Sequence, residues 1–187
     1  MTFTYEARSN LLMLVDLVNS GRRDVEDLPD PASLTEFVRT HGFSGPLTGT
    51  ATELERVHAV RSEFATVFGA DSVESVVALV NATLLRCNAL PQLVDHDDWG
   101  WHLHAVAQTA PLADRIAIDI ALVLVDVVRD GELSRLQHCA AEDCDAVFVD
   151  FSRNRSKRYC DVGNCGNRAH VAAYRRRQEA AEAAEAG

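Results

Sequence analysis

Four cysteines near the C-terminal end constrain this chain more than any other feature. Cys139 and Cys144 are separated by four residues, fifteen residues follow, and Cys160 and Cys165 repeat the same spacing. Two matched pairs at ligand spacing are typical of metal sites, and four thiolates can close a tetrahedral zinc shell completely. Because a closed shell leaves no position for a substrate, the sequence predicts one structural Zn²⁺ ion rather than a catalytic one.

Free thiols, a disulfide and an iron–sulfur cluster are the alternatives for these cysteines. The first ten residues include an acid, Glu6, and the apolar run 11–18 contains Asp16, so neither a signal peptide nor a membrane span is expected. We therefore expect a cytoplasmic protein, in which thiols stay reduced and clustered cysteines favour metal over disulfide. Nothing else in the chain indicates electron transfer, and Cys87 is expected to be an inert core residue.

The region before the cysteines is predicted to be mainly helical. Apolar residues recur at helical spacing from Tyr5 to Ser20, and residues typical of helix starts predict three further helices beginning near Asp30, Thr50 and Asp71. Residues 111–130 form the most hydrophobic segment of the chain. We predict that this segment is a nearly buried helix, because its polar residues recur at helical spacing in one narrow stripe: Arg115, Asp119, Asp126 and Arg129.

Residues 90–109 show a different pattern, in which apolar and polar side chains alternate. Trp101 and Leu103 fall on one face of this pattern and His102 falls on the other. The alternation predicts two short strands with a turn at Asp97–Asp98.

These patterns together predict an α+β fold made of two domains. Residues 1–133 are expected to form a mainly helical domain with a small β-hairpin or sheet. Residues 134–187 are expected to form a treble-clef or ribbon-like zinc finger, because residues 146–151 alternate as a strand does and strong helix formers follow Arg168.

The cysteine region resembles the CGNR zinc finger. The motif is spelled by residues 165–168, and Phe148, Asp150 and Ser152-Arg-Asn precede it at the spacing of that family. Residues 14–19, Leu-Val-Asp-Leu-Val-Asn, resemble the opening of the ABATE domain, which usually precedes this finger. The resemblance implies a bacterial, stress-induced transcription regulator, with the four cysteines as zinc ligands and a C-terminal region that binds nucleic acid.

Charge is distributed unevenly along the chain. Residues 1–152 carry 10 Arg and 24 acidic residues, a net charge of −14, whereas residues 153–178 carry a net charge of +7. An acidic body repels phosphate, so any contact with nucleic acid belongs to the basic stretch. We predict that eight basic residues bind DNA, with RNA as the alternative: Arg153, Arg155, Lys157, Arg158, Arg168, Arg175, Arg176 and Arg177.

Pairing within the protein is the alternative role for these basic residues. They are also able to pair with the acidic first domain, or with Glu179 and Glu182 along the last helix. The chain would then be a zinc-stabilised adaptor for protein–protein interaction. Arg168 is a candidate for contact with bases or for bracing the zinc loop, and Val171 and Tyr174 are expected to pack onto the finger.

A small zinc module beside a larger apolar domain suggests an effector module joined to a sensor of a small molecule. The candidate ligand-binding residues are Asn19, Trp101, His102 and His104; their alternatives are a helix cap, a core position and two solvated histidines. The chain lacks a glycine-rich phosphate loop and the common nucleophile and metalloprotease motifs, so we expect a binding protein rather than an enzyme. No membrane partner is expected, and the oligomeric state stays open, with a homodimer among the alternatives.

Overall fold

The computed structural model describes residues 3–43, 45–95 and 100–185, and the predicted α+β fold is confirmed. Two separate antiparallel sheets, β1–β2 and β3–β4, accompany the helices. None of the described helices is long and apolar enough to cross a membrane. The elements are α1 (Tyr5–Asn19), α2 (Pro31–Thr40), α3 (Ala51–Ala65), α4 (Val73–Arg86), β1 (Gln92–Asp95), β2 (Trp101–His104), α5 (Leu112–Arg129), a 3₁₀ turn (Leu133–Arg135), β3 (Leu136–His138), β4 (Val147–Val149) and α6 (Cys165–Glu185).

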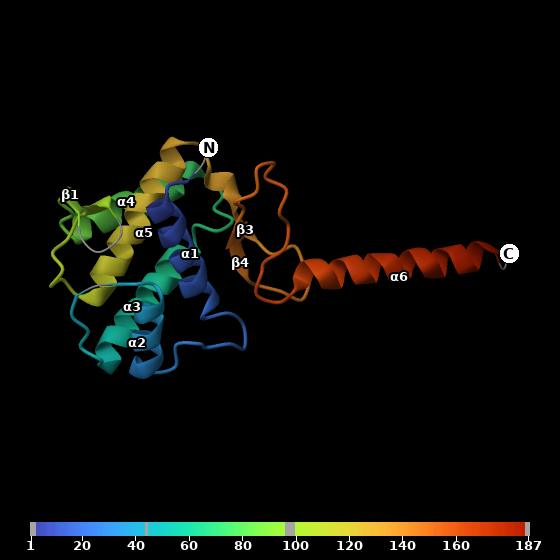
Figure 1. Ribbon diagram of the computed structural model, residues 1–187, viewed down its shortest axis with the longest axis horizontal. Coiled ribbons are helices and arrows are strands. Elements are labelled where there is room, and N and C mark those ends of the chain that lie inside the picture. Colours follow the sequence, from blue (N-terminus) through green and yellow to red (C-terminus); the bar gives the residue numbers. More distant parts are fainter. Residues whose placement is uncertain (1–2, 44, 96–99, 186–187) are drawn as a thin grey trace.

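Helix α5 lies at the centre of the helical domain, where it packs against α1, α3 and α4 (Figure 1). Ile116, Ile120 and Leu124 are fully buried, which confirms the prediction of a nearly buried helix. The polar stripe of this helix does not all face solvent. Arg115 is buried and Asp119 is half-buried, so the first half of the stripe faces into the protein.

The helices begin at the capping residues read from the sequence, with two corrections. Asp30 caps α2, and Thr50 caps α3 by accepting a hydrogen bond from the Glu53 N–H at 3.2 Å. The Glu53 carboxylate does not complete the predicted capping box, because it accepts from the backbone N–H groups of the two residues before Thr50. Helix α4 is capped by the Ser72 hydroxyl rather than by Asp71, and so begins one residue later than predicted.

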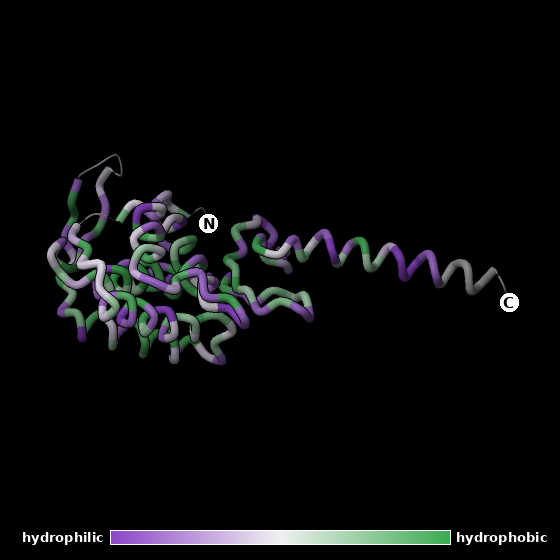
Figure 2. The backbone as a smooth tube through the Cα atoms, turned by 90° about the horizontal axis from the view of Figure 1, so that it is seen from below, coloured by the Kyte–Doolittle hydropathy of each residue, from purple (hydrophilic) through white to green (hydrophobic). Residues whose placement is uncertain are grey.

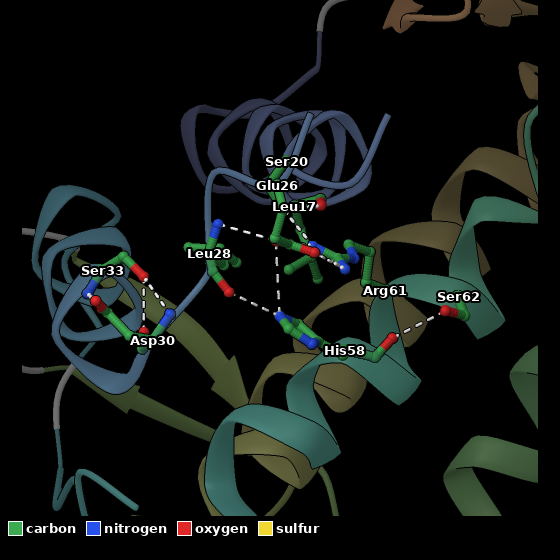
Figure 3. A network of polar contacts seen from close by, with 9 residues as sticks. All are labelled: Leu17, Ser20, Glu26, Leu28, Asp30, Ser33, His58, Arg61 and Ser62. Carbon is green, nitrogen blue, oxygen red and sulfur yellow. Dashed lines mark hydrogen bonds and ion pairs between the residues drawn. The ribbon is translucent and has the colours of Figure 1, made fainter. Parts of the chain in front are cut away.

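A polar network fixes the connection between α1 and α2 against α3. Figure 3 shows Arg61 and His58 of α3 pointing toward this connection. Arg61 donates to the two carboxylate oxygens of Glu26 at 2.8 and 2.6 Å and to the Ser20 hydroxyl at 3.1 Å, and His58 Nε2 lies 3.0 Å from the Leu28 carbonyl oxygen. The hydrogen bond from Arg61 lowers the pKa of Glu26 below its usual value. The network holds the C-terminal end of α1, where Asn19 hydrogen-bonds to Val147 of β4.

The first hairpin, β1–β2, confirms the predicted strands, and the predicted turn at Asp97–Asp98 lies outside the described residues. Its apolar face is not the buried one: Trp101 is 72% exposed, whereas His102 is buried. The polar atoms of His102 are satisfied locally. Its Nδ1 lies 2.7 Å from the Gly100 carbonyl oxygen and its Nε2 lies 3.0 Å from Nε2 of His104. A buried histidine with both ring nitrogens engaged costs little, which is why the polar face can turn inward.

The second hairpin, β3–β4, packs on different parts of the protein with its two faces. Val147 and Val149 belong to the hydrophobic core of the helical domain, whereas Phe148 between them packs with the cysteine cluster. The alternation of side chains along a strand places neighbours on opposite faces, so one short strand serves both cores. The predicted boundary after residue 133 falls just before this hairpin, which is therefore shared by the two units.

Helix α6 begins at the last cysteine and projects away from the rest of the protein (Figure 1). Hydrophilic residues occupy most of its length (Figure 2). The prediction that Val171 and Tyr174 pack onto the finger is wrong, since they are 43% and 56% exposed. The helix projects away from the finger (Figure 1), and the described part of the protein leaves both side chains open to solvent.

Candidate functional site

The four cysteines predicted from the sequence come together at one point. Their sulfur atoms all lie within 4.8 Å of one another, and three of the four residues are buried. Cys139 and Cys144 come from the loop that joins β3 to β4, Cys160 comes from the loop after β4, and Cys165 is the first residue of α6. A hairpin loop and a helix start that share one ligand cluster match the predicted treble-clef arrangement.

The spacing of the sulfur atoms fits a tetrahedral zinc ion. A Zn–S bond of about 2.3 Å implies about 3.8 Å between sulfurs at the corners of a tetrahedron. The Cys144 and Cys160 sulfurs lie 3.7 Å apart, and so do those of Cys160 and Cys165. These separations are far longer than the roughly 2.05 Å of a disulfide. The donor set therefore suits one structural zinc ion, held by four thiolates with no open position.

Backbone hydrogen bonds hold the two ligand loops against each other. The Cys139 N–H donates to the Ala146 carbonyl at 2.8 Å, which closes the first loop, and the Ala140 N–H donates to the Arg158 carbonyl at 2.8 Å, which joins it to the second. The Cys160 N–H donates to the Cys139 sulfur at 3.4 Å. Donors aimed at the sulfurs stabilise the negative charge that four thiolates bring to the ion.

Arg168, the last residue of the CGNR motif, contacts the ligand cluster directly. Its Nη2 lies 3.1 Å from the Cys165 sulfur, and its guanidinium also pairs with Asp143 in the first ligand loop. The hydrogen bonds with Asp143 and then with Cys165 raise the pKa of Arg168 above its usual value. Of the two roles considered for this residue, the geometry supports bracing of the zinc loop. Sequence reasoning missed Asp143 as its partner.

We predict that Arg168→Ala weakens zinc affinity about 10- to 100-fold, because it removes a charged donor to a ligand sulfur and opens the link between the loops. Competition with a chromophoric chelator measures this affinity. Arg175→Ala is the matched control, since Arg175 lies two helical turns further along α6 and is exposed. Equal zinc affinity in the Arg168 variant and the wild type would contradict the bracing role.

The loop between β4 and Cys160 is held by buried charged groups that sequence reasoning also missed. Asp150 accepts hydrogen bonds from the backbone N–H groups of Ser152 and Lys157 at 2.7 and 2.9 Å. Burial alone would raise the pKa of Asp150, but hydrogen bonds from Ser152 and Lys157 outweigh it and lower the pKa. Arg135 donates to the carbonyls of Asp150 and Ser152 at 2.7 and 2.9 Å and pairs with Glu132 at 2.5 Å. Asp150 belongs to the motif quoted above, which was the one available signal for this loop.

The eight predicted nucleic-acid-binding residues divide into two groups. Three of them form ion pairs with acidic residues: Arg155, Lys157 and Arg168. For the other five, no ion pair is formed with any residue that the structure describes, and all five are exposed: Arg153, Arg158, Arg175, Arg176 and Arg177. Ion pairs among the described residues therefore involve only three of the eight basic residues. Glu179 makes no ion pair within the described part of the chain, and the side chain of Glu182 lies outside it.

The four predicted sensor residues do not form one site. His102 and His104 line a cavity of about 90 Å³ between α1, β2 and α5, whereas Trp101 is exposed beside it and is not among its lining residues. Asn19 lies at the other end of α1. Its amide N–H donates to the Val147 carbonyl at 2.9 Å, and its amide oxygen accepts from the Val147 N–H at 2.8 Å. Asn19 thus joins the helical domain to the finger and has no free polar atom for a ligand.

Three charged residues that sequence reasoning did not propose as ligand-binding also line this cavity: Glu6, Arg115 and Asp119. Burial and, to a smaller extent, the nearby Glu6 raise the pKa of Asp119 to about 7, against the opposing effect of Arg115. Burial likewise raises the pKa of Glu6, against the effects of His102 and of a hydrogen bond from the Leu103 backbone. The signal for Asp119 was its place in the polar stripe of a helix that is otherwise apolar.

Four thiolates that close a buried tetrahedral site at the start of a helix define a structural zinc finger, here joined to a helical domain. Residues 135–178 match the CGNR zinc finger. Residues 13–131 match the ABATE domain, whose family is described as "Putative stress-induced transcription regulator". Because the second match covers more than half of the chain, the chain belongs to the ABATE family. No curated protein matches the chain.

Proposed function

We propose that this protein is a transcription regulator that binds DNA through α6 and the loop after β4. The observation that carries the proposal is the position of the exposed arginines. Arg175, Arg176 and Arg177 lie on a helix that projects from an acidic body, and no described acidic residue pairs with them. Arginine suits this role because its planar fork matches phosphate oxygens. Arg153 and Arg158 are further exposed arginines, in the loop between β4 and Cys160 that precedes the helix.

A bacterial regulator of this kind acts in the cytoplasm by binding rather than by catalysis, and its helical domain is the proposed sensor. The cavity lined by His102 and His104 supports that role, because it offers a small molecule several polar groups in a partly enclosed space. The stress response is proposed on the family description alone.

A protein-interaction adaptor is the second candidate function. Val171 and Tyr174 are exposed apolar side chains on the projecting helix, and such residues are more frequent at protein interfaces than elsewhere on a surface. The charge of the helix favours nucleic acid over this alternative, because three consecutive unpaired arginines oppose a purely apolar contact.

The test is the salt dependence of binding to a duplex of random sequence, measured by fluorescence anisotropy on the full-length, zinc-loaded protein. With about four to six phosphate contacts, the logarithm of the association constant should fall with the logarithm of the salt concentration with a slope of about −4 to −5. Arg175→Ala with Arg176→Ala should weaken binding to every sequence and flatten the slope by about 2.

Arg129→Ala is the matched control, because Arg129 is an exposed arginine of α5 on the acidic body and has only a long contact, 3.9 Å, with Asp126. It should leave both the affinity and the slope unchanged. Single-stranded and duplex RNA of the same length separate the two kinds of nucleic acid. A folded, zinc-loaded protein that shows no salt-sensitive binding to DNA or RNA would favour the adaptor.

A further inference from the structure

The cavity between α1, β2 and α5 has an excess of negative charge. Among its described lining residues, Glu6 and Asp119 are acidic and Arg115 is basic. With neutral histidines, these groups carry one net negative charge when both acids are ionised. Its volume of about 90 Å³ is room for about six to nine water-sized groups, at roughly 10 to 15 Å³ each. The cavity therefore matches a small ligand with one positive charge.

Asp119 is the group in this cavity that most needs a partner. It lies on the central helix α5 and lines the cavity, and no hydrogen bond or ion pair of its carboxylate is found among the residues that the structure describes. The residue is half-buried, so a molecule inside the cavity is able to reach its carboxylate. A cationic ligand that donates hydrogen bonds to this carboxylate gains charge-assisted contacts, which are stronger than those between neutral groups.

Arg115 does not supply the missing donor. Its Nε donates to the Ala110 carbonyl at 3.1 Å and its Nη2 donates to the Pro46 carbonyl at 2.5 Å, so the guanidinium joins the segments before α3 and α5. His102 and His104 contact each other through their Nε2 atoms. The basic groups of the cavity are thus engaged in structural contacts, whereas Asp119 lines the cavity without such a contact among the described residues.

We propose that this cavity binds a small organic ammonium ion, with Asp119 as the principal acceptor of its N–H groups and Glu6 as the second. An ammonium group carries three donors and one positive charge, which match the acceptor oxygens of the two acids and the net negative charge of the cavity. The proposal names the ligand class for the proposed sensor domain. It rests on the proposed function only for the biological use of the site, because ligand binding is measured without nucleic acid.

The affinity should depend on pH through Asp119, whose pKa lies at about 7. Glu6 on α1 and Arg115 on α5 act on this pKa, and three histidines also line the cavity: His102 and His104 on β2 and His41 after α2. An ammonium ion favours the ionised carboxylate and binds poorly to the protonated one. Its affinity should therefore fall as the pH drops below 7, approaching tenfold per pH unit.

The test is isothermal titration of the full-length, zinc-loaded protein with propylammonium chloride at constant ionic strength. Sodium propionate and 1-propanol are probes of similar size with a negative charge and no charge. We expect propylammonium to bind once per chain, with a dissociation constant on the order of 1 mM, as suits a ligand of four non-hydrogen atoms. The other two probes should not bind. Binding of propionate in preference to propylammonium, or no binding of any probe, would overturn the proposal.

Variants locate the site. Asp119→Asn should weaken propylammonium binding at least tenfold and abolish its pH dependence near 7, and Glu6→Gln should weaken it less. Asp126→Asn is the control, because Asp126 is an exposed acid further along the same helix. If Asp119→Asn does not fold, the affinity of the Glu6→Gln variant for propylammonium tests the assignment instead. Wild-type affinity in a folded Glu6 or Asp119 variant would place the bound ion elsewhere and refute the assignment, while leaving the proposal on DNA binding unaffected.

Discussion

Cys160→Ser is expected to reduce the zinc content from one ion per chain to nearly none. Cys160 is the ligand whose sulfur lies 3.7 Å from both Cys144 and Cys165, so its loss opens the shell on two edges. A structural zinc ion contributes folding free energy on the order of 10 kcal/mol to a small module, which cannot hold its fold without the metal. Elemental analysis and hydrogen exchange of residues 139–165 measure the two effects.

The effect of this variant should extend beyond the finger. Val147 and Val149 complete the core of the helical domain, so their release should lower the melting temperature of that domain while its helices persist. Cys87→Ser is the matched control, since Cys87 lies at the end of α4 and outside the four-cysteine cluster. A Cys160 variant that retains stoichiometric zinc would refute the four-thiolate site.

Asn19→Ala is expected to destabilise the whole chain by about 2 to 4 kcal/mol. The side chain of Asn19 is buried and makes both backbone hydrogen bonds of Val147, at 2.9 and 2.8 Å. Its removal leaves a buried N–H and a buried carbonyl unsatisfied, and each such group costs about 1 to 3 kcal/mol. Chemical denaturation of the zinc-loaded protein measures this change.

Asn10→Ala is the control on the same helix, because Asn10 is half-buried and lines the cavity instead of contacting the finger. We expect it to cost less than about 1 kcal/mol. A ligand-binding role for Asn19 predicts no such ranking: the Asn10 and Asn19 variants would be equally stable and would differ only in ligand affinity. The two variants together therefore separate the structural role from the proposed sensor role.

The metal site could be predicted from the sequence because its chemistry acts over short stretches of chain. Ligand loops need close cysteine pairs, and Cys139, Cys144, Cys160 and Cys165 are spaced accordingly. The central helix was equally predictable, since helical periodicity is a local property that Ile116, Ile120 and Leu124 display.

Contacts between distant segments could not be predicted in this way. Asn19 and Val147 are 128 residues apart, and neither residue type indicates the other. Alternation in β2 showed which residues share a face but not which face is buried. The buried face is the one with His102, and its contact with His104 satisfies a ring nitrogen there. The acids of the cavity come from α1 and α5, so only the packing of those helices brings Glu6 near Asp119.

The hairpin shared by the two cores also has a consequence for the newly made chain. A ribosome completes α1 long before it adds β4. Until β4 is made, Asn19 lacks its hydrogen-bond partner and the helical core lacks Val147 and Val149, and these two valines lie between zinc ligands in the sequence. The helical domain cannot finish its core until the segment that captures the metal has emerged. A cell short of zinc would therefore accumulate chains that are incomplete in both units, and the supply of one ion would set the yield of the entire protein.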